Sequence, residues 1–157
     1  MSDQDSTPQP AAWRPGVRIG VDVGRARIGL AASDPHGLLA TPVCTVHRTA
    51  SDSGLDKIAD AVREYEAVEV IVGLPVTLQG EERQAASEVR RYVRQLARKV
   101  YPVPVRLVDE RMSTVVATRR LSERGVRGRR RRSVVDQAAA VEILQGWLDA
   151  ERRQRHA

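Results

Sequence analysis

A chain of 157 residues with 41% apolar residues has the size and composition of a single domain with its own core. No apolar run reaches the roughly 18 residues of a membrane span, and the polar, Pro-rich N-terminus lacks the basic and apolar regions of a signal peptide. The single Cys44 excludes an intramolecular disulfide framework and a cysteine zinc site. We therefore expect a cytoplasmic protein in which Cys44 is a small core residue.

The net charge of +6 is distributed unevenly along the chain. Residues 1–110 hold 14 Lys and Arg against 15 Asp and Glu, whereas residues 111–157 hold 12 Arg against 5 acids. Eight Arg and one Glu lie between Arg119 and Arg132. Arg grips phosphate bidentately, so this segment predicts binding to a polyanion; a solvated basic loop is the alternative. We expect one domain at 16–150, between a disordered tail at 1–15 and a basic tail at 151–157.

The first predicted elements are two short strands within residues 18–34, joined by a tight turn at 24–26. Side chains alternate along a strand, so Asp22 lies on the face opposite Val21 and Val23, with a glycine two residues to either side. Asp is depleted in strands, and glycine leaves room for a bulky group to approach. Asp22 is therefore either a metal-binding carboxylate beneath a phosphate or a turn-flanking Asp that bonds the backbone after it.

The later elements follow from apolar periodicity and turn residues. Three consecutive strands with short turns predict an antiparallel meander, and a strand, loop and helix at 68–100 form half of a βαβ unit. The predicted elements after the first two strands are a strand at about 39–46, a helix at 55–65 capped within 51–53, a strand at 68–72, a helix at about 85–100, a strand at 103–108, a helix capped by Ser113 or Thr114 that runs through Leu121 and ends near Gly125, and a last helix from Ser133 after an Arg-rich loop at 126–132.

Three acids lie at positions where catalytic residues usually occur in proteins built on a sheet. Asp22 is on the first strand, Glu110 follows a later strand, and Asp136 is in line with the apolar face of the last helix. Asp136 is also explained as the N3 residue of a helix capped by Ser133, and Glu110 as the partner of Arg111. Three carboxylates without His or Cys partners suit Mg²⁺ or Mn²⁺, which catalyse phosphodiester hydrolysis.

Four segments carry a resemblance to a known family. VDVGRARIGLAASD, VGLPVTLQG, VDERMSTVVA and VVDQAAAVEILQ occur in this order and resemble the motifs of the YqgF/RuvX family of RNase H-like proteins. The similarity covers about 17–148. It implies an α/β fold with a five-stranded mixed sheet, the first three strands antiparallel, and helices on both faces. It also implies a metal-dependent nuclease that matures the 5′ end of pre-16S rRNA, or a Holliday junction resolvase.

The resemblance assigns the catalytic and metal-binding roles to Asp22, Glu110 and Asp136, with Mg²⁺ or Mn²⁺ as cofactor. The related RuvC-type resolvases use four acids, two of them on the final helix, but here Ala139 stands three residues after Asp136. One or two bound ions are therefore alternatives, with Asp109 or the substrate as further sources of oxygen ligands.

Nucleic acid is the partner that these features predict, either pre-rRNA or branched DNA. We expect a monomer or a homodimer, the latter favoured by junction cleavage. The residues expected to contact nucleic acid are polar or basic and lie near the acids or in the Arg-rich segment: Arg27, Arg111, Thr114, Arg127, Arg129, Arg130, Arg131 and Arg132.

Three other classes of protein share parts of this pattern. Sugar kinases and actin-like ATPases have a similar Asp-Xaa-Gly turn but need two such domains. Exonucleases of the DEDD type have Asp-Xaa-Glu on the first strand, where this chain has Asp22, Val23 and Gly24. An RNA-binding assembly factor that keeps the fold without activity is the remaining alternative, and the presence of all three acids favours the enzyme.

Overall fold

The computed structural model describes residues 13–77, 79–112 and 129–156, with residues 112 and 129–134 described by their backbone alone. Five strands form one mixed sheet in the order β3-β2-β1-β4-β5. The first three strands are antiparallel, and β4 and β5 run parallel to β1, as the resemblance implies. The strands are β1 (Arg18–Val23), β2 (Arg27–Ser33), β3 (Ala40–His47), β4 (Glu69–Leu74) and β5 (Val105–Asp109).

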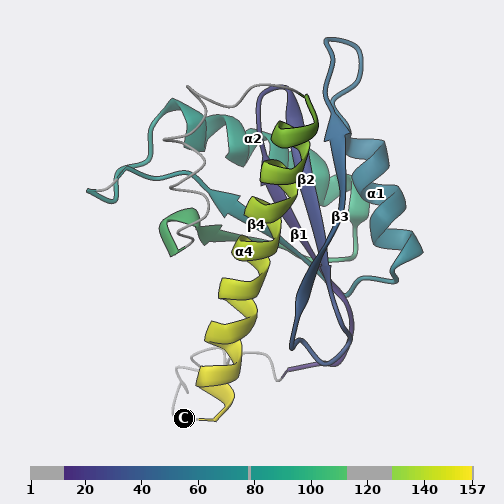
Figure 1. Cartoon of the computed structure of the whole chain (residues 1–157), viewed down its shortest axis with the longest axis vertical. Coiled ribbons are helices and arrows are strands. Elements are labelled where there is room, and N and C mark those ends of the chain that lie inside the picture. The colour runs from purple at the N-terminus through teal and green to yellow at the C-terminus, as the bar shows by residue number, and fades with distance from the viewer. Residues whose placement is uncertain (1–12, 78, 113–128, 157) are drawn as a thin grey trace, which may run out of the picture.

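Helices cover both faces of this sheet (Figure 1). Helices α1 (Leu55–Glu64) and α2 (Gln84–Val100) pack on one face, and the long α4 (Arg129–Arg155) crosses the other. A 3-10 turn, η1 (Glu110–Met112), follows β5 directly. In the described parts of the chain, no helix is long and apolar enough to cross a membrane.

The predicted alternation on β1 is confirmed, and it divides the core in two. Ile19 and Val21 are fully buried in the cluster beneath α1 and α2. The opposite face carries Gly20 and Asp22 and receives α4, whose Leu144 belongs to a second cluster. A Cβ on Gly20 would lie 2.7 Å from Cβ of Leu144. The space predicted beside Asp22 at this glycine is thus filled by α4, not by a substrate.

The largest departure from the predicted elements is the start of the last helix. Helix α4 begins at Arg129, four residues before the expected Ser133. The backbone of 129–132 is therefore helical, and Asp136 lies in the second turn, which rules out a role as the N3 capping residue. The N-cap of α1 is Gly54, with φ of 83°, and not Ser51 to Ser53. The helix predicted through Leu121 to about Gly125 lies outside the described residues.

The two chain ends of the domain meet around a stack of aromatic and arginine side chains. The Arg18 guanidinium, 3% exposed, lies 3.7 Å from the ring centroid of Trp13 and bonds Oε2 of Glu69 at 3.0 Å. The centroids of Trp13 and Trp147 on α4 are 6.2 Å apart, and Arg155 covers Trp13 at 4.0 Å. Trp13, expected in a disordered tail, is thus part of the fold, and α4 extends into the expected C-terminal tail.

Candidate active site

A row of residues across three strands forms the centre of the site. Asp22 on β1 pairs directly with Gly29 on β2. On the other side, Val21 is in register with Val72 on β4, so the following residues, Asp22 and Gly73, also lie side by side. Residues abreast in a sheet point to the same face. Asp22, 3% exposed, is therefore flanked on both neighbouring strands by positions without a side chain.

Gly29 allows the backbone of α4 to approach β2 closely. A Cβ at Gly29 would lie 2.1 Å from the carbonyl oxygen of Asp136 and 3.1 Å from the nitrogen of Gln137. These atoms are backbone and cannot swing away as a side chain would. Asp136 thus stands against the strand position opposite Asp22, although the two acids are far apart in sequence. Their side chains are both buried, with Asp136 6% exposed.

Gly73 faces Ile143 of α4 and lies beside Glu110. A Cβ at Gly73 would lie 2.7 Å from Cδ1 of Ile143 and 3.5 Å from Cβ of Glu110. Glu110, 5% exposed, is the first residue of η1, immediately after β5. The two glycines therefore let the last helix approach the row that contains Asp22, and Glu110 lies next to Gly73 in this row. The predicted acids come from three distant segments, and the fold brings them to the carboxyl ends of β1 and β5.

Arg27 is placed inside the site and not on a free surface. Its Nε donates to Oδ2 of Asp136 at 2.7 Å, and its side chain is 26% exposed. This contact supplies a positive charge beside a buried carboxylate, which reduces the cost of its burial. Arg27 was expected to contact nucleic acid; in this structure it neutralises Asp136.

Arg111 is likewise engaged within the chain. It grips the carboxylate of Asp109, with Nη2 2.6 Å from Oδ2, and its Nη1 reaches the carbonyl of Thr77 at 3.4 Å. The hydrogen bond from Arg111 holds the pKa of Asp109 below its usual value, and the same contact raises the pKa of Arg111. Both groups are thus charged at neutral pH. The pair attaches η1 to the loop before α2, and Asp109 is directed to Arg111.

The remaining predicted contacts are Thr114 and five arginines of the Arg-rich segment. Thr114 and Arg127 are outside the described residues. The other four, Arg129 to Arg132, form the first turn of α4, described by its backbone. The next turn of α4 contains Asp136, whose backbone contacts Gly29, so the segment leads directly to the site.

The acids do not form a preassembled cage. Over the described ranges, no three His, Cys, Asp or Glu side chains are grouped closely enough to hold a metal ion. The fold places the three acids near neighbouring positions of the sheet, and their predicted role as metal ligands stays a prediction. Their chemistry still fits a hard cation, because the donors are buried carboxylate oxygens.

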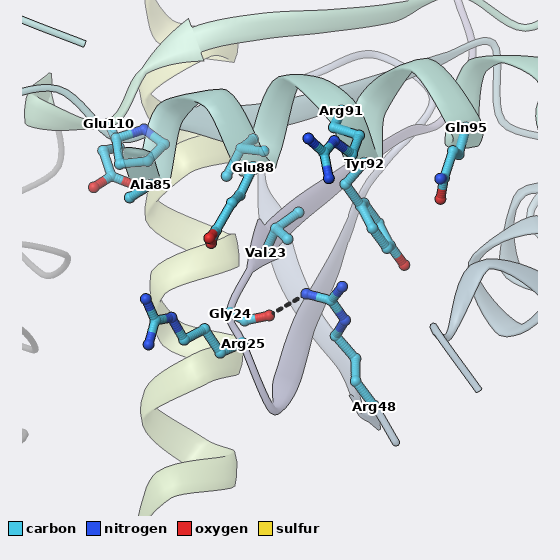
Figure 2. Close-up of a pocket in the computed structure, with 12 residues that line it drawn as sticks. Val23, Gly24, Arg25, Arg48, Ala85, Glu88, Arg91, Tyr92, Gln95 and Glu110 are labelled. Atoms are coloured by element: carbon cyan, nitrogen blue, oxygen red, sulfur yellow. Dashed lines mark hydrogen bonds between the residues drawn. The ribbon is translucent and has the colours of Figure 1, made fainter. Parts of the chain in front are cut away.

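The flanking glycines and a neighbouring cleft were not identified from the sequence. The glycines two residues from Asp22 on its own strand were noted, but Gly29 and Gly73 act through strand pairing. The cleft lies between α2 and the β1–β2 turn, with Glu110 at one end (Figure 2). Its arginines, Arg25, Arg48 and Arg91, are scattered in sequence. The sequence signal for Gly29 and Gly73 was a glycine inside each of two apolar strand segments.

Comparison with known proteins defines the class. A family model described as "RuvX: Holliday junction resolvase" matches residues 16–150. The structure also resembles two solved structures of RuvC from Thermus thermophilus. One is in complex with a Holliday junction substrate and aligns with a TM-score of 0.55 at 16% identity, over 87% of this chain and 96% of that chain. The other aligns with a TM-score of 0.51 at 14% identity, with the same coverage. The fold is therefore RNase H-like.

The chain belongs to the RuvX family. A relative from Rhodococcus opacus, named "Putative pre-16S rRNA nuclease", is 57% identical over 156 residues, which cover 92% of this chain and 87% of that protein. A relative of the same name from Mycolicibacterium smegmatis is 52% identical and covers 97% of this chain and 93% of its own length. The family expected from the four motifs is confirmed over almost the same residues.

Proposed function

We propose that this protein is a metal-dependent endonuclease that hydrolyses a phosphodiester bond of RNA, and that it matures the 5′ end of pre-16S rRNA in the cytoplasm. The observation that carries the proposal is the row Gly29, Asp22 and Gly73, beside which two further buried acids, Asp136 and Glu110, are placed. The names of the curated relatives support RNA as the substrate.

The chemistry of the three buried carboxylates supports a role for a cation. They offer only oxygen donors, without His or Cys among them. Asp22, Glu110 and Asp136 would hold Mg²⁺ or Mn²⁺, both of which prefer oxygen ligands. Because Arg27 bonds one oxygen of Asp136, we expect the ion to compete with Arg27 for this carboxylate. The bound ion would supply an activated water and neutralise charge on the phosphate.

The residues of the chain have distinct parts in this proposal. Asp22 is the anchor, because it is fixed on a central strand and the flanking positions, Gly29 and Gly73, carry no side chain. Glu110 and Asp136 complete the set of oxygen ligands. Arg27, when displaced from Asp136, is close enough to the site to receive a negatively charged phosphate oxygen. No activated Ser, Cys or His nucleophile is recognisable in the sequence, so water attacks directly, without a covalent intermediate.

Junction resolution is the second candidate, because the family model carries that description. The position of a fourth acid in RuvC-type enzymes is occupied here by Ala139, which is fully buried in the cluster beneath α4. A carboxylate is thus missing where junction enzymes of that type have one, and we favour RNA.

The test offers the purified protein three labelled substrates in parallel, with Mg²⁺ and with Mn²⁺. These are an RNA spanning the 5′ end of 16S rRNA and its precursor sequence, a four-way DNA junction, and a plain duplex. Cleavage of the RNA supports the proposal. Cleavage of the DNA junction alone would show that the protein is a junction resolvase instead. RNA binding without cleavage of any substrate would identify it as an RNA-binding assembly factor.

A further inference from the structure

A cleft of about 580 Å³ opens beside Glu110, between α2 and the β1–β2 turn. Figure 2 shows α2 along one wall, with Glu88, Arg91 and Gln95 on it, and the turn with Arg25 along the other. The cleft extends from Glu110 along α2 for several turns of the helix. A substrate strand that reached Glu110 would thus have an open path on this side of the sheet.

The end of the cleft farthest from Glu110 is held by a chain of specific contacts. Nη1 of Arg48 donates to the carbonyl of Gly24 at 2.7 Å, and its guanidinium lies 4.8 Å from the ring centroid of Tyr92. The Tyr92 hydroxyl donates to the carbonyl of Ser53 at 2.8 Å. Burial raises the pKa of Tyr92 to about 12, so the hydroxyl keeps its proton at neutral pH. These contacts fix the β1–β2 turn relative to α2.

Two further arginines line the cleft without such internal roles. Arg25 and Arg91 are exposed, one on each wall, and neither forms an ion pair with an acid in the described parts of the chain. Glu88 lies on the α2 wall and would repel a phosphate. The phosphates of a strand in the cleft would therefore contact Arg25 and Arg91, with the sugar or base edge facing Glu88, whose carboxylate accepts hydrogen bonds from amino or 2′-hydroxyl groups.

We propose that this cleft binds a short unpaired segment of the RNA substrate next to the bond to be cut, so that the enzyme acts at the boundary between a duplex and a single strand. The inference rests on the proposed nuclease function, since Glu110 links the cleft to the acids. The volume of the cleft suits a short stretch of unpaired nucleic acid and is too small for a double helix. The paired part of the substrate would then lie toward the Arg-rich start of α4.

The test measures binding in full-length Asp22→Asn protein, which retains the cleft but is not expected to cleave. Fluorescence anisotropy compares one RNA duplex with blunt ends against the same duplex with a single-stranded 5′ or 3′ overhang. Arg25→Ala/Arg91→Ala removes the two arginines of the cleft. Arg94→Ala/Arg98→Ala is the matched control, because both residues are exposed on α2, carry the same charge and do not line the cleft.

We expect one of the two overhang duplexes to bind more tightly than the blunt duplex. The cleft variant should weaken overhang binding roughly tenfold, as two exposed charge contacts are lost, and reduce the salt slope by about one per lost contact. Blunt binding should stay unchanged, and the control variant should keep the preference. Equal binding of blunt and overhang duplexes, or equal losses in both double variants, would overturn the inference.

Failure of the cleft proposal and failure of the nuclease proposal give different results in these experiments. Wild-type protein that cleaves RNA but shows no overhang preference would remove the role of the cleft alone. An overhang preference that depends on Arg25 and Arg91, in a protein that cleaves nothing, would keep the cleft and remove the nuclease assignment.

Discussion

At the scale of single residues, the site depends on the absence of a side chain at Gly29 and Gly73. Gly29 should be the less tolerant, because an added Cβ would lie 2.1 Å from the Asp136 carbonyl oxygen, whereas at Gly73 the nearest atom is the flexible Cδ1 of Ile143. We expect Gly29→Ala to lower the free energy of unfolding by about 1–3 kcal/mol, the usual cost of overpacking, and Gly73→Ala by less. Thermal denaturation checks both values.

Gly146 provides the control for this comparison. It lies within α4, and a Cβ there would meet no atom within 4 Å. Gly146→Ala should therefore be neutral or stabilise the protein by up to about 1 kcal/mol, through helix propensity. A Gly29→Ala protein as stable as the Gly146→Ala protein would show that α4 does not need its close contact with β2.

Arg27 gives a second prediction at this scale, on metal linkage. In Arg27→Gln, Asp136 loses its 2.7 Å ion pair and the buried carboxylates repel one another more strongly. We expect a lower melting temperature without metal and a larger rise on adding Mg²⁺ than in wild type, because a ligand that binds only the folded state stabilises it. Arg25→Gln, with the same charge change two residues away, should show the wild-type rise. An equal rise in all three proteins would argue against competition between Arg27 and the ion.

At the scale of elements, α4 has two functions along its length. Its first turns carry the Arg-rich segment and Asp136, while its last turns pack Trp147 near Trp13 and Arg18. We expect Trp13→Ala to destabilise the protein by about 1–3 kcal/mol, less than a fully buried Trp would, because Trp13 is only partly buried. In the Trp13→Ala protein, amide hydrogen exchange should become faster than in wild type first in the last turns of α4.

Tyr101→Ala is the control for the aromatic stack. Tyr101 is 83% exposed, so its replacement should change the free energy of unfolding by no more than about 0.5 kcal/mol. If Trp13→Ala had an equally small effect, the N-terminal segment would not anchor α4, and the boundary expected from sequence, with 1–15 as a tail, would describe the protein better.

At the scale of the whole molecule, the sequence predicts the layers better than the site. Alternation on β1 and apolar spacing on the helices identify buried faces because each is a local property of the chain. The start of α4 was misplaced because Arg129 to Arg132 have no apolar period and Ser133 is a favourable capping residue. The roles of Gly29 and Gly73, and the cleft, depend on which strands lie beside β1, and no local pattern contains that information.

The three acids were identifiable because each belongs to a motif or to a strand end. How the fold arranges them was not, since the approach of α4 to Gly29 places Asp136 beside the strand position paired with Asp22. The same holds for Arg27, whose partner is 109 residues away. From the sequence it was one of several arginines expected to contact nucleic acid, and its buried partner appears only in the folded chain.

The most direct measurement of the central claim is single-turnover cleavage of the pre-16S 5′-end RNA in Mg²⁺ by wild type, Asp22→Asn and Asp60→Asn. Asp60 undergoes the same chemical change but lies exposed on α1. We predict that Asp22→Asn slows cleavage by about a hundredfold or more while unfolding at the same temperature as wild type or higher, and that Asp60→Asn cleaves normally. Cleavage by Asp22→Asn at the wild-type rate would contradict the assignment of this site as a metal-dependent nuclease centre.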